Sequence, residues 1–139
     1  MVTTRQRIIT DSDRIRLKAM IQSLRTAGRP YERFASDLQE MLDAATVVPA
    51  RAVDPDIVTL NSIVRVRDLD SGALETVKLV DESESGGLDG GVSILTSLGA
   101  ALLGARAGDV IDWELRWGRT ELRIEMVSYQ PERAGHFHL

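Results

Sequence analysis

The stretch Thr96-Ser-Leu-Gly-Ala-Ala-Leu-Leu-Gly-Ala-Arg-Ala-Gly-Asp109 decides the fold of this chain. Ser97 can cap a short helix, and the leucines of residues 98–103 give that helix one apolar face. Gly104 ends the helix, and Gly108-Asp109 turns the chain into the next segment. The stretch therefore predicts one short helix, with a cap at its start and a glycine at its end, that packs against the segments on either side of it.

The segments around this helix alternate apolar and polar residues with a period of two, which is typical of strands with one buried face. Asp70-Ser71-Gly72 and Trp117-Gly118-Arg119 provide tight turns between them. The pattern predicts an antiparallel sheet with one short helix packed on it, and α+β as the fold class. The expected strands cover residues 64–69, 75–80, 92–95, 110–115 and 122–127.

The N-terminal part has the three-and-four spacing of helices instead. Thr10-Asp11-Ser12-Asp13 offers N-cap candidates, and Gly28 with Pro30 ends a first helix near residue 27. A second apolar seam runs from Tyr31 to Ala45, and the short connection predicts a short antiparallel coiled-coil hairpin whose base leans on the sheet. The expected domains are the hairpin at 1–48, a linker at 49–60 and the sheet domain at 61–139.

Composition excludes several classes of protein. The chain has 139 residues, no cysteine and 43% hydrophobic residues, so a disulfide framework and thiolate chemistry are absent. No run approaches the roughly 18 apolar residues that span a bilayer, and the N-terminus has no signal-peptide pattern. A cytoplasmic protein without membrane association is expected.

Charge is distributed unevenly along the chain. The net charge of −4 argues against a nucleic-acid binder that works through bulk electrostatics. Residues 1–35 hold eight bases and three acids, whereas residues 61–139 hold eight bases and thirteen acids. This contrast indicates two units that face different surfaces of a partner, or merely a solvated helix face of mixed sign.

Residues suited to catalysis are scarce. The only histidines, His136 and His138, lie within the last four residues, where a frayed tail is favoured over a metal site. Because no histidine lies outside that tail, a catalytic Ser-His pair is not expected. The acids of the glycine-rich segment 81–91 lack the spacing of a calcium loop, and its glycines do not form a phosphate-binding loop. No catalytic residue, cofactor or metal is expected, and the chain is predicted not to be an enzyme.

The stretch at 96–109 resembles the C-terminal domain of the Gre transcript-cleavage factors, which have Ser-Pro where this chain has Ser97-Leu98. It is more similar still to the Rnk-type regulators of nucleoside diphosphate kinase in the same superfamily. The resemblance covers about residues 45–135 in order. The other stretches that carry it are Asp56–Val66, Gly99–Gly104, Gly108-Asp109 with Trp113–Leu115, and Tyr129–Glu132 with Ala134-Gly135.

The resemblance implies an FKBP-like C-terminal domain that docks on RNA polymerase near its secondary channel, with the coiled coil pointing inward. It implies that Thr96, Ser97, Leu98 and Gly99 form the polymerase-facing edge. Gre factors carry acids at the coiled-coil tip that hold Mg²⁺, but this tip carries Arg25, Gly28 and Arg29. Guanidinium groups repel Mg²⁺, so a regulator that competes with Gre factors without stimulating cleavage is expected.

Three alternatives remain open at this point. The first is a Gre-like elongation factor with residual cleavage stimulation. The second is a prolyl isomerase, which would need an aromatic-lined pocket, and the sheet domain offers only Trp113, Trp117, Tyr129 and Phe137. The third is a module that binds another protein, or its own copy, through exposed heptads. A monomer without direct sequence-specific nucleic-acid binding is the expected state.

Overall fold

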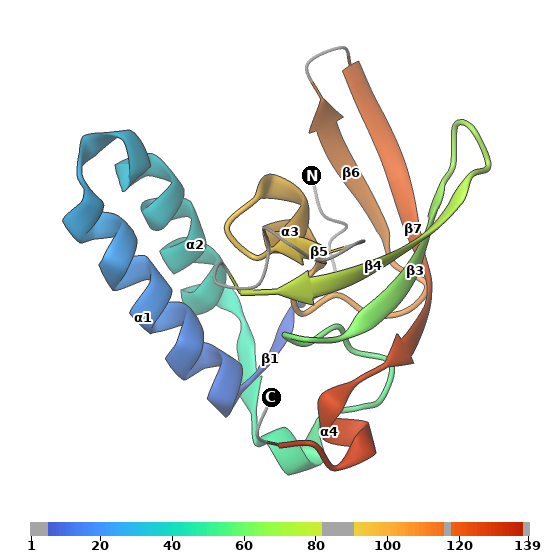
Figure 1. Ribbon diagram of the computed structural model, residues 1–139, viewed down its shortest axis with the longest axis horizontal. Helices are drawn as coiled ribbons and strands as arrows, with labels where there is room; N and C mark the ends of the chain where they lie inside the picture. The colour runs from blue at the N-terminus through green and yellow to red at the C-terminus, as the bar shows by residue number, and fades with distance from the viewer. Residues whose placement is uncertain (1–5, 82–90, 116–117, 138–139) are drawn as a thin grey trace.

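The computed structural model describes residues 6–81, 91–115 and 118–137 and begins with the expected helical hairpin (Figure 1). Helix α1 (Asp11–Ala27) and helix α2 (Glu32–Ala44) lie side by side and are joined by the 3₁₀ turn η1 (Arg29–Tyr31). Thr10 caps α1, and Gly28 stands at its end with a φ of 113°, which favours glycine. Both helices match the sequence prediction closely.

The second part of the chain is a five-stranded sheet in the order β5-β4-β3-β7-β6. Three of its four pairings are antiparallel, as predicted, but β5 pairs in parallel with β4, so the sheet is mixed. The register of this parallel pair places Leu79 of β4 opposite Val92 of β5. The strands are β3 (Ile63–Asp68), β4 (Leu74–Val80), β5 (Gly91–Ser93), β6 (Val110–Leu115) and β7 (Gly118–Tyr129).

A second, two-stranded sheet was not expected from the sequence. Strand β1 (Ile8–Thr10) pairs in parallel with strand β2 (Thr46–Val48), directly before α1 and after α2. An antiparallel hairpin brings its two ends together, so the chain entering it and the chain leaving it lie next to each other. The pair closes the base of the hairpin.

Three short helical segments complete the fold. Helix α3 (Ser97–Leu102) is the predicted short helix, but Thr96 rather than Ser97 is its N-cap. The 3₁₀ turn η2 (Ala50–Ala52) and helix α4 (Pro131–Ala134), which Gln130 caps, were not expected. The segment expected as a linker, residues 49–60, contains η2, and its last four residues are buried.

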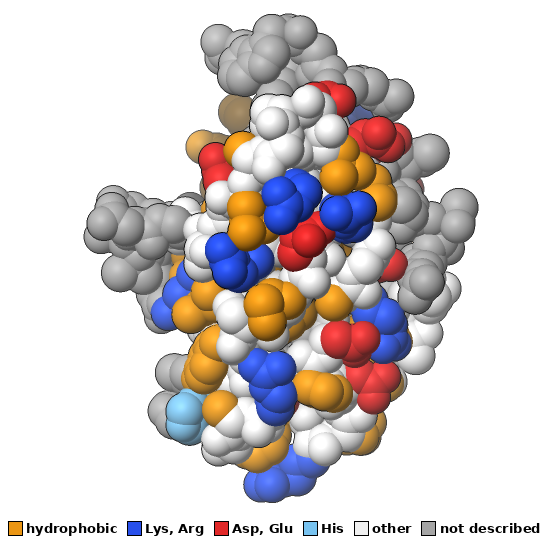
Figure 2. Space-filling view, turned by 90° about the vertical axis from the view of Figure 1, so that its right-hand side faces the viewer, with side chains coloured by type: hydrophobic (Ala, Val, Ile, Leu, Met, Phe, Trp, Pro, Cys, Tyr) orange, Lys and Arg blue, Asp and Glu red, His pale blue; other side chains and the backbone are white. Residues whose placement is uncertain are grey.

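One hydrophobic core joins the hairpin to the sheet, as the sequence predicted. Leu17 of α1 and Leu38 of α2 are buried in the same cluster as Leu60, Val64 and Ile111. The other face of the sheet is exposed, and Figure 2 shows charged and scattered apolar side chains on that side of the molecule. The hairpin is thus fixed at its base, while its far end projects from the core.

None of the helices in the described ranges is both long enough and apolar enough to span a bilayer.

Candidate functional site

The tip of the hairpin presents the basic residues that the sequence singled out. Arg25 lies in the last turn of α1, Gly28 follows that helix, and Arg29 begins η1, and all three are exposed. Arg33 and Glu32, in the first turn of α2, are exposed beside them. The tip therefore offers three guanidinium groups and one carboxylate to whatever approaches it.

The segment Thr96–Gly99 forms the N-terminal end of α3. The Thr96 hydroxyl oxygen accepts a hydrogen bond from the Gly99 amide at 3.1 Å and donates one to the Ser93 carbonyl at 2.7 Å. Thr96 and Ser97 are exposed, Leu98 is half-buried and Gly99 is buried. The four residues are adjacent in the chain, but only the first three are accessible at the surface.

Gly99 is required for packing. A Cβ atom built on Gly99 would lie 2.0 Å from the Ser93 carbonyl oxygen and 2.9 Å from the Cα atom of Ile94. Both contacts are with backbone, which cannot move aside as a flexible side chain can. Gly99 therefore positions the exposed edge of α3 through its backbone, and it offers no side chain to a partner.

Leu98 lines an apolar groove on the concave face of the sheet, with a volume of about 360 Å³. Hydrogen bonds from the Asp70 and Ser71 amides lower the pKa of Asp68, so its carboxylate stays ionised at the groove. The described lining residues include no aromatic side chain, unlike the isomerase pocket considered above. The lining consists of Val66, Asp68, Ser71, Ala73, Glu75, Val77, Val92, Leu98, Thr120 and Leu122.

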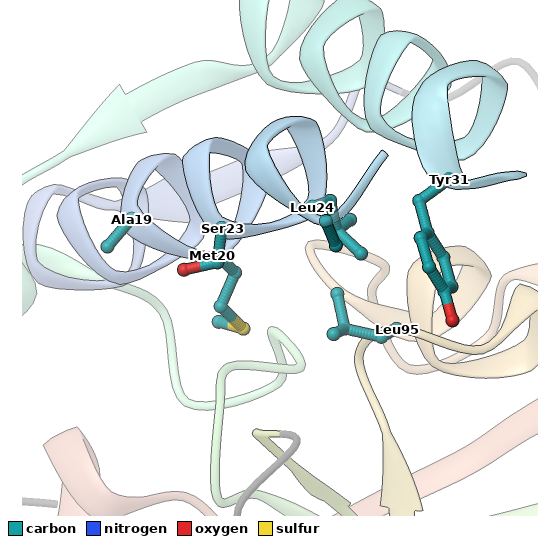
Figure 3. Close-up of a pocket in the computed structure, with 7 residues that line it drawn as sticks. Ala19, Met20, Ser23, Leu24, Tyr31 and Leu95 are labelled. Carbon is teal, nitrogen blue, oxygen red and sulfur yellow. The ribbon is translucent and has the colours of Figure 1, made fainter. Parts of the chain in front are cut away.

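A second cleft connects the tip to α3 (Figure 3). Met20 and Leu24 of α1, Tyr31 of η1 and Leu95, which precedes Thr96, line about 330 Å³. Figure 3 shows the side chains of Leu24, Tyr31 and Leu95 gathered at one end of the cleft. Tyr31 is 47% exposed and brings an aromatic ring to this cleft beside Leu24 and Leu95.

Sequence reasoning missed the role of Arg7. Its guanidinium donates hydrogen bonds to the Ala100 carbonyl at 2.8 Å and to the Leu103 carbonyl at 2.6 Å, at the C-terminal end of α3. Burial lowers the pKa of Arg7 from its ordinary value. Cations stabilise helix C-termini, but no local signal links a residue before α1 to a helix more than 90 positions later. Arg7 fixes α3 against the base of the hairpin.

The remaining candidate groups give no assembled site in the described part of the chain. The Nδ1 atom of His136 is 2.6 Å from the Tyr129 hydroxyl, whereas His138 lies outside the described residues. The acids Glu82, Glu84 and Asp89 and the side chains of Trp113 and Trp117 also lie outside them. Among the described residues, no group of three or more His, Cys, Asp and Glu is placed to hold a metal ion.

Comparison with known proteins relates this geometry to one family. The family model described as "Transcription elongation factor, GreA/GreB, C-term" matches residues 53–129. The chain is 36% identical over 133 residues to the regulator of nucleoside diphosphate kinase of Escherichia coli strain K12, which covers 95% of this chain and 96% of that protein. It is also 32% identical over 87 residues to transcription elongation factor GreA of Clostridium perfringens strain SM101, which covers 63% of this chain and 55% of that protein.

A solved structure agrees with these sequence matches. The prokaryotic transcription elongation factor GreA/GreB from Nitrosomonas europaea superposes with a TM-score of 0.74 at 31% identity. The superposition covers 91% of this chain and 100% of that one. Its coverage includes both the hairpin and the sheet, so the likeness extends beyond the C-terminal domain.

Proposed function

We propose that this chain, which belongs to the GreA/GreB family, binds RNA polymerase. Its hairpin and sheet together are similar to a regulator of nucleoside diphosphate kinase. The chain docks near the mouth of the secondary channel, directs its hairpin inward and competes with Gre factors without stimulating transcript cleavage. The chain thus acts as a transcription regulator and not as an enzyme.

The charge of the hairpin tip is the observation that carries this proposal. Mg²⁺ takes hard oxygen ligands, which carboxylates supply. The tip instead exposes Arg25, Arg29 and Arg33, with Glu32 as its one described carboxylate. A catalytic Mg²⁺ would be repelled by this tip, so occupation of the channel is expected without assistance to cleavage.

The position of α3 supports docking through Thr96, Ser97 and Leu98. Leu98 faces the concave groove, where an apolar partner side chain can be accommodated, and Thr96 and Ser97 are exposed beside it. The cleft that contains Leu95 and Tyr31 runs from this edge toward the tip. A partner that binds the edge of α3 therefore lies on a surface continuous with the hairpin.

A pull-down with core RNA polymerase tests the docking edge. The double variant Ser97→Glu/Leu98→Glu should lose binding, because two charges would replace a hydroxyl and an apolar contact. Ser36→Glu, which adds one such charge at an exposed position on α2, is the control and should bind as the wild type does. Circular dichroism establishes that each variant is folded, and unchanged binding by a folded double variant would refute the edge.

A backtracked polymerase complex tests the absence of cleavage stimulation. The protein should leave the transcript uncut at concentrations that displace a Gre factor, and cleavage induced by that Gre factor should decrease as the protein is added. Robust shortening of the RNA by the protein alone would instead support the alternative of a cleavage-stimulating elongation factor.

A monomer is the proposed binding species. Leu38, at the centre of the second-helix seam, is buried against the core, which leaves less of the seam for pairing with another copy. Tyr31 is the exposed member of that seam. Light scattering over a range of concentrations distinguishes a monomer from a self-paired module, whose mass would rise with concentration.

A further inference from the structure

The outer face of the sheet, opposite the concave groove, carries a cluster of basic side chains. Along β3, Val64 and Val66 are buried while Arg65 is exposed. The same alternation on β4 turns Lys78 outward between Val77 and Leu79. We call this surface the outer-face patch, and it consists of Arg65, Arg67, Leu74, Lys78, Arg123, Glu125 and Met126.

The outer-face patch is positively charged in a chain of net charge −4. It contains four of the eight bases of residues 61–139 and one acid, and Figure 2 shows blue side chains around a red one on this side. Glu125 lies 3.7 Å from the Nε atom of Arg67 and also accepts a hydrogen bond from Arg123, which lowers its pKa. Arg65 and Lys78 form no ion pair with any described residue, so positive charge remains for a partner.

Apolar side chains accompany these bases on the same strands. Met126 is 48% exposed and is the register partner of Arg65 across β3 and β7. Leu74 is 38% exposed and is the register partner of Arg67 across β3 and β4. Single exposed apolar residues are ordinary, but two that adjoin arginines on a rigid sheet give the composition of a protein interface, in which Met and Arg are enriched.

We propose that the outer-face patch docks an acidic, amphipathic segment of a second protein. Its carboxylates pair with Arg65 and Lys78, and its apolar side chains cover Met126 and Leu74. A single-stranded nucleic acid is the less favoured ligand because the seven residues of the outer-face patch include no aromatic ring for base stacking and the whole chain is acidic. Since the patch lies on the opposite side of the sheet from α3, this partner can bind while the edge of α3 is occupied.

Site-specific photo-crosslinking in cells tests the proposal. A photoreactive amino acid replaces Met126, and in a matched control it replaces Glu121, which is exposed on the same strand outside the patch. Mass spectrometry then identifies the crosslinked peptide. We expect a crosslink from position 126 to an acidic protein segment with apolar residues, and a much weaker one from position 121.

Charge reversal establishes whether the bases recognise that segment. Arg65→Glu/Lys78→Glu should lower the crosslink yield at position 126 by about tenfold or more, whereas Arg65→Lys/Lys78→Arg should retain it. Both side chains are free of described ion pairs, so the melting temperature should change little, and circular dichroism checks this. A crosslink to nucleic acid, a protein crosslink that survives charge reversal, or no crosslink above the control would each overturn the proposal.

Discussion

Helices α1 and α3 begin with the same cap but serve different purposes. The Thr10 hydroxyl accepts a hydrogen bond from the Asp13 amide at 3.1 Å, and the Thr96 hydroxyl accepts one from the Gly99 amide at the same distance. Thr10 is fully buried at the base of the hairpin, whereas Thr96 is exposed. The Thr10 cap therefore fixes α1 in the core, and the Thr96 cap stabilises the start of α3 at the solvent-exposed surface.

The residue three positions after each cap explains this difference. The Asp13 carboxylate accepts a hydrogen bond from the Leu60 amide at 3.0 Å, which ties α1 to the turn before β3. Gly99 has no side chain, and its backbone lies against the Ser93 carbonyl. The same local motif therefore anchors the hairpin in one case and brings α3 close to β5 in the other.

The largest effect is expected at Gly99. Gly99→Ala should lower the free energy of unfolding by about 3 kcal/mol, because the new Cβ atom would overlap the Ser93 carbonyl oxygen. Gly72→Ala is the control, because the φ of 79° is strained for alanine but no atom lies within 4 Å of a Cβ built there. It should lower the free energy of unfolding by about 1 kcal/mol. Urea unfolding measures both, and equal losses would show that close approach at Gly99 is unimportant.

The two caps themselves should differ by less. Thr10→Ala leaves a buried amide without an acceptor and should lower the free energy of unfolding by about 2 kcal/mol. At Thr96 water can replace the hydroxyl because the site is exposed, so Thr96→Ala should cost about 1 kcal/mol or less. If Thr96→Ala proved the more damaging in urea unfolding, the distinction between an anchoring cap and a surface cap would fail.

The Asp13 carboxyl at the buried start of α1 should make the free energy of unfolding depend on pH, with an effect of similar or smaller size. Burial raises the pKa of Asp13 from 3.8 to about 6, and the nearby Glu132 adds to the increase. The folded state therefore holds this proton more tightly than the unfolded state, so the stabilisation is complete below pH 3.8 and is lost as pH rises through about 6.

Comparison with Asp13→Asn isolates this contribution. The wild type should gain about 1 kcal/mol of unfolding free energy relative to the variant when the pH falls from 7 to 5. The other ionisable groups are present in both proteins, so their contributions largely cancel in the difference. A difference that stays constant across this pH range in urea unfolding would contradict the assignment.

Elements with a sustained period or clear end signals could be predicted from the sequence. The helices of the hairpin, the strands β3 and β4 and the short helix α3 all carry such signals. Strands β1 and β2 could not be predicted, because three residues are too few to show a period and their pairing depends on the hairpin geometry. The composition of β4 and β5 likewise carries no signal of their parallel pairing.

The candidate site could be predicted only as a stretch of sequence. The sequence identified residues 96–99 as one edge, but it could not show that Gly99 is buried or that Leu98 faces a groove. It also gave no signal that Arg7 binds the end of α3, because that contact spans more than 90 residues. The alternation of Arg65 and Arg67 with buried valines was a signal for the outer-face patch, visible once the strand was assigned.

The smallest change in stability is expected at the hairpin tip, which contrasts with both caps. Arg25 and Arg29 are exposed and form no ion pair with a described residue, so Arg25→Glu/Arg29→Glu should alter the free energy of unfolding by about 0.5 kcal/mol or less. Part of that change arises because Arg25 lies in the last turn of α1, where a cation is favoured.

Any role of the tip must then lie in contacts with a partner. In competition with a Gre factor for RNA polymerase, the double variant should be weaker than the wild type although it is equally stable. Lys18→Glu, an exposed charge reversal within α1 that makes half of the same change in net charge, should compete nearly as the wild type does. A stability loss above about 1 kcal/mol in urea would assign the arginines to the fold instead, because exposed substitutions without lost contacts do not reach that size.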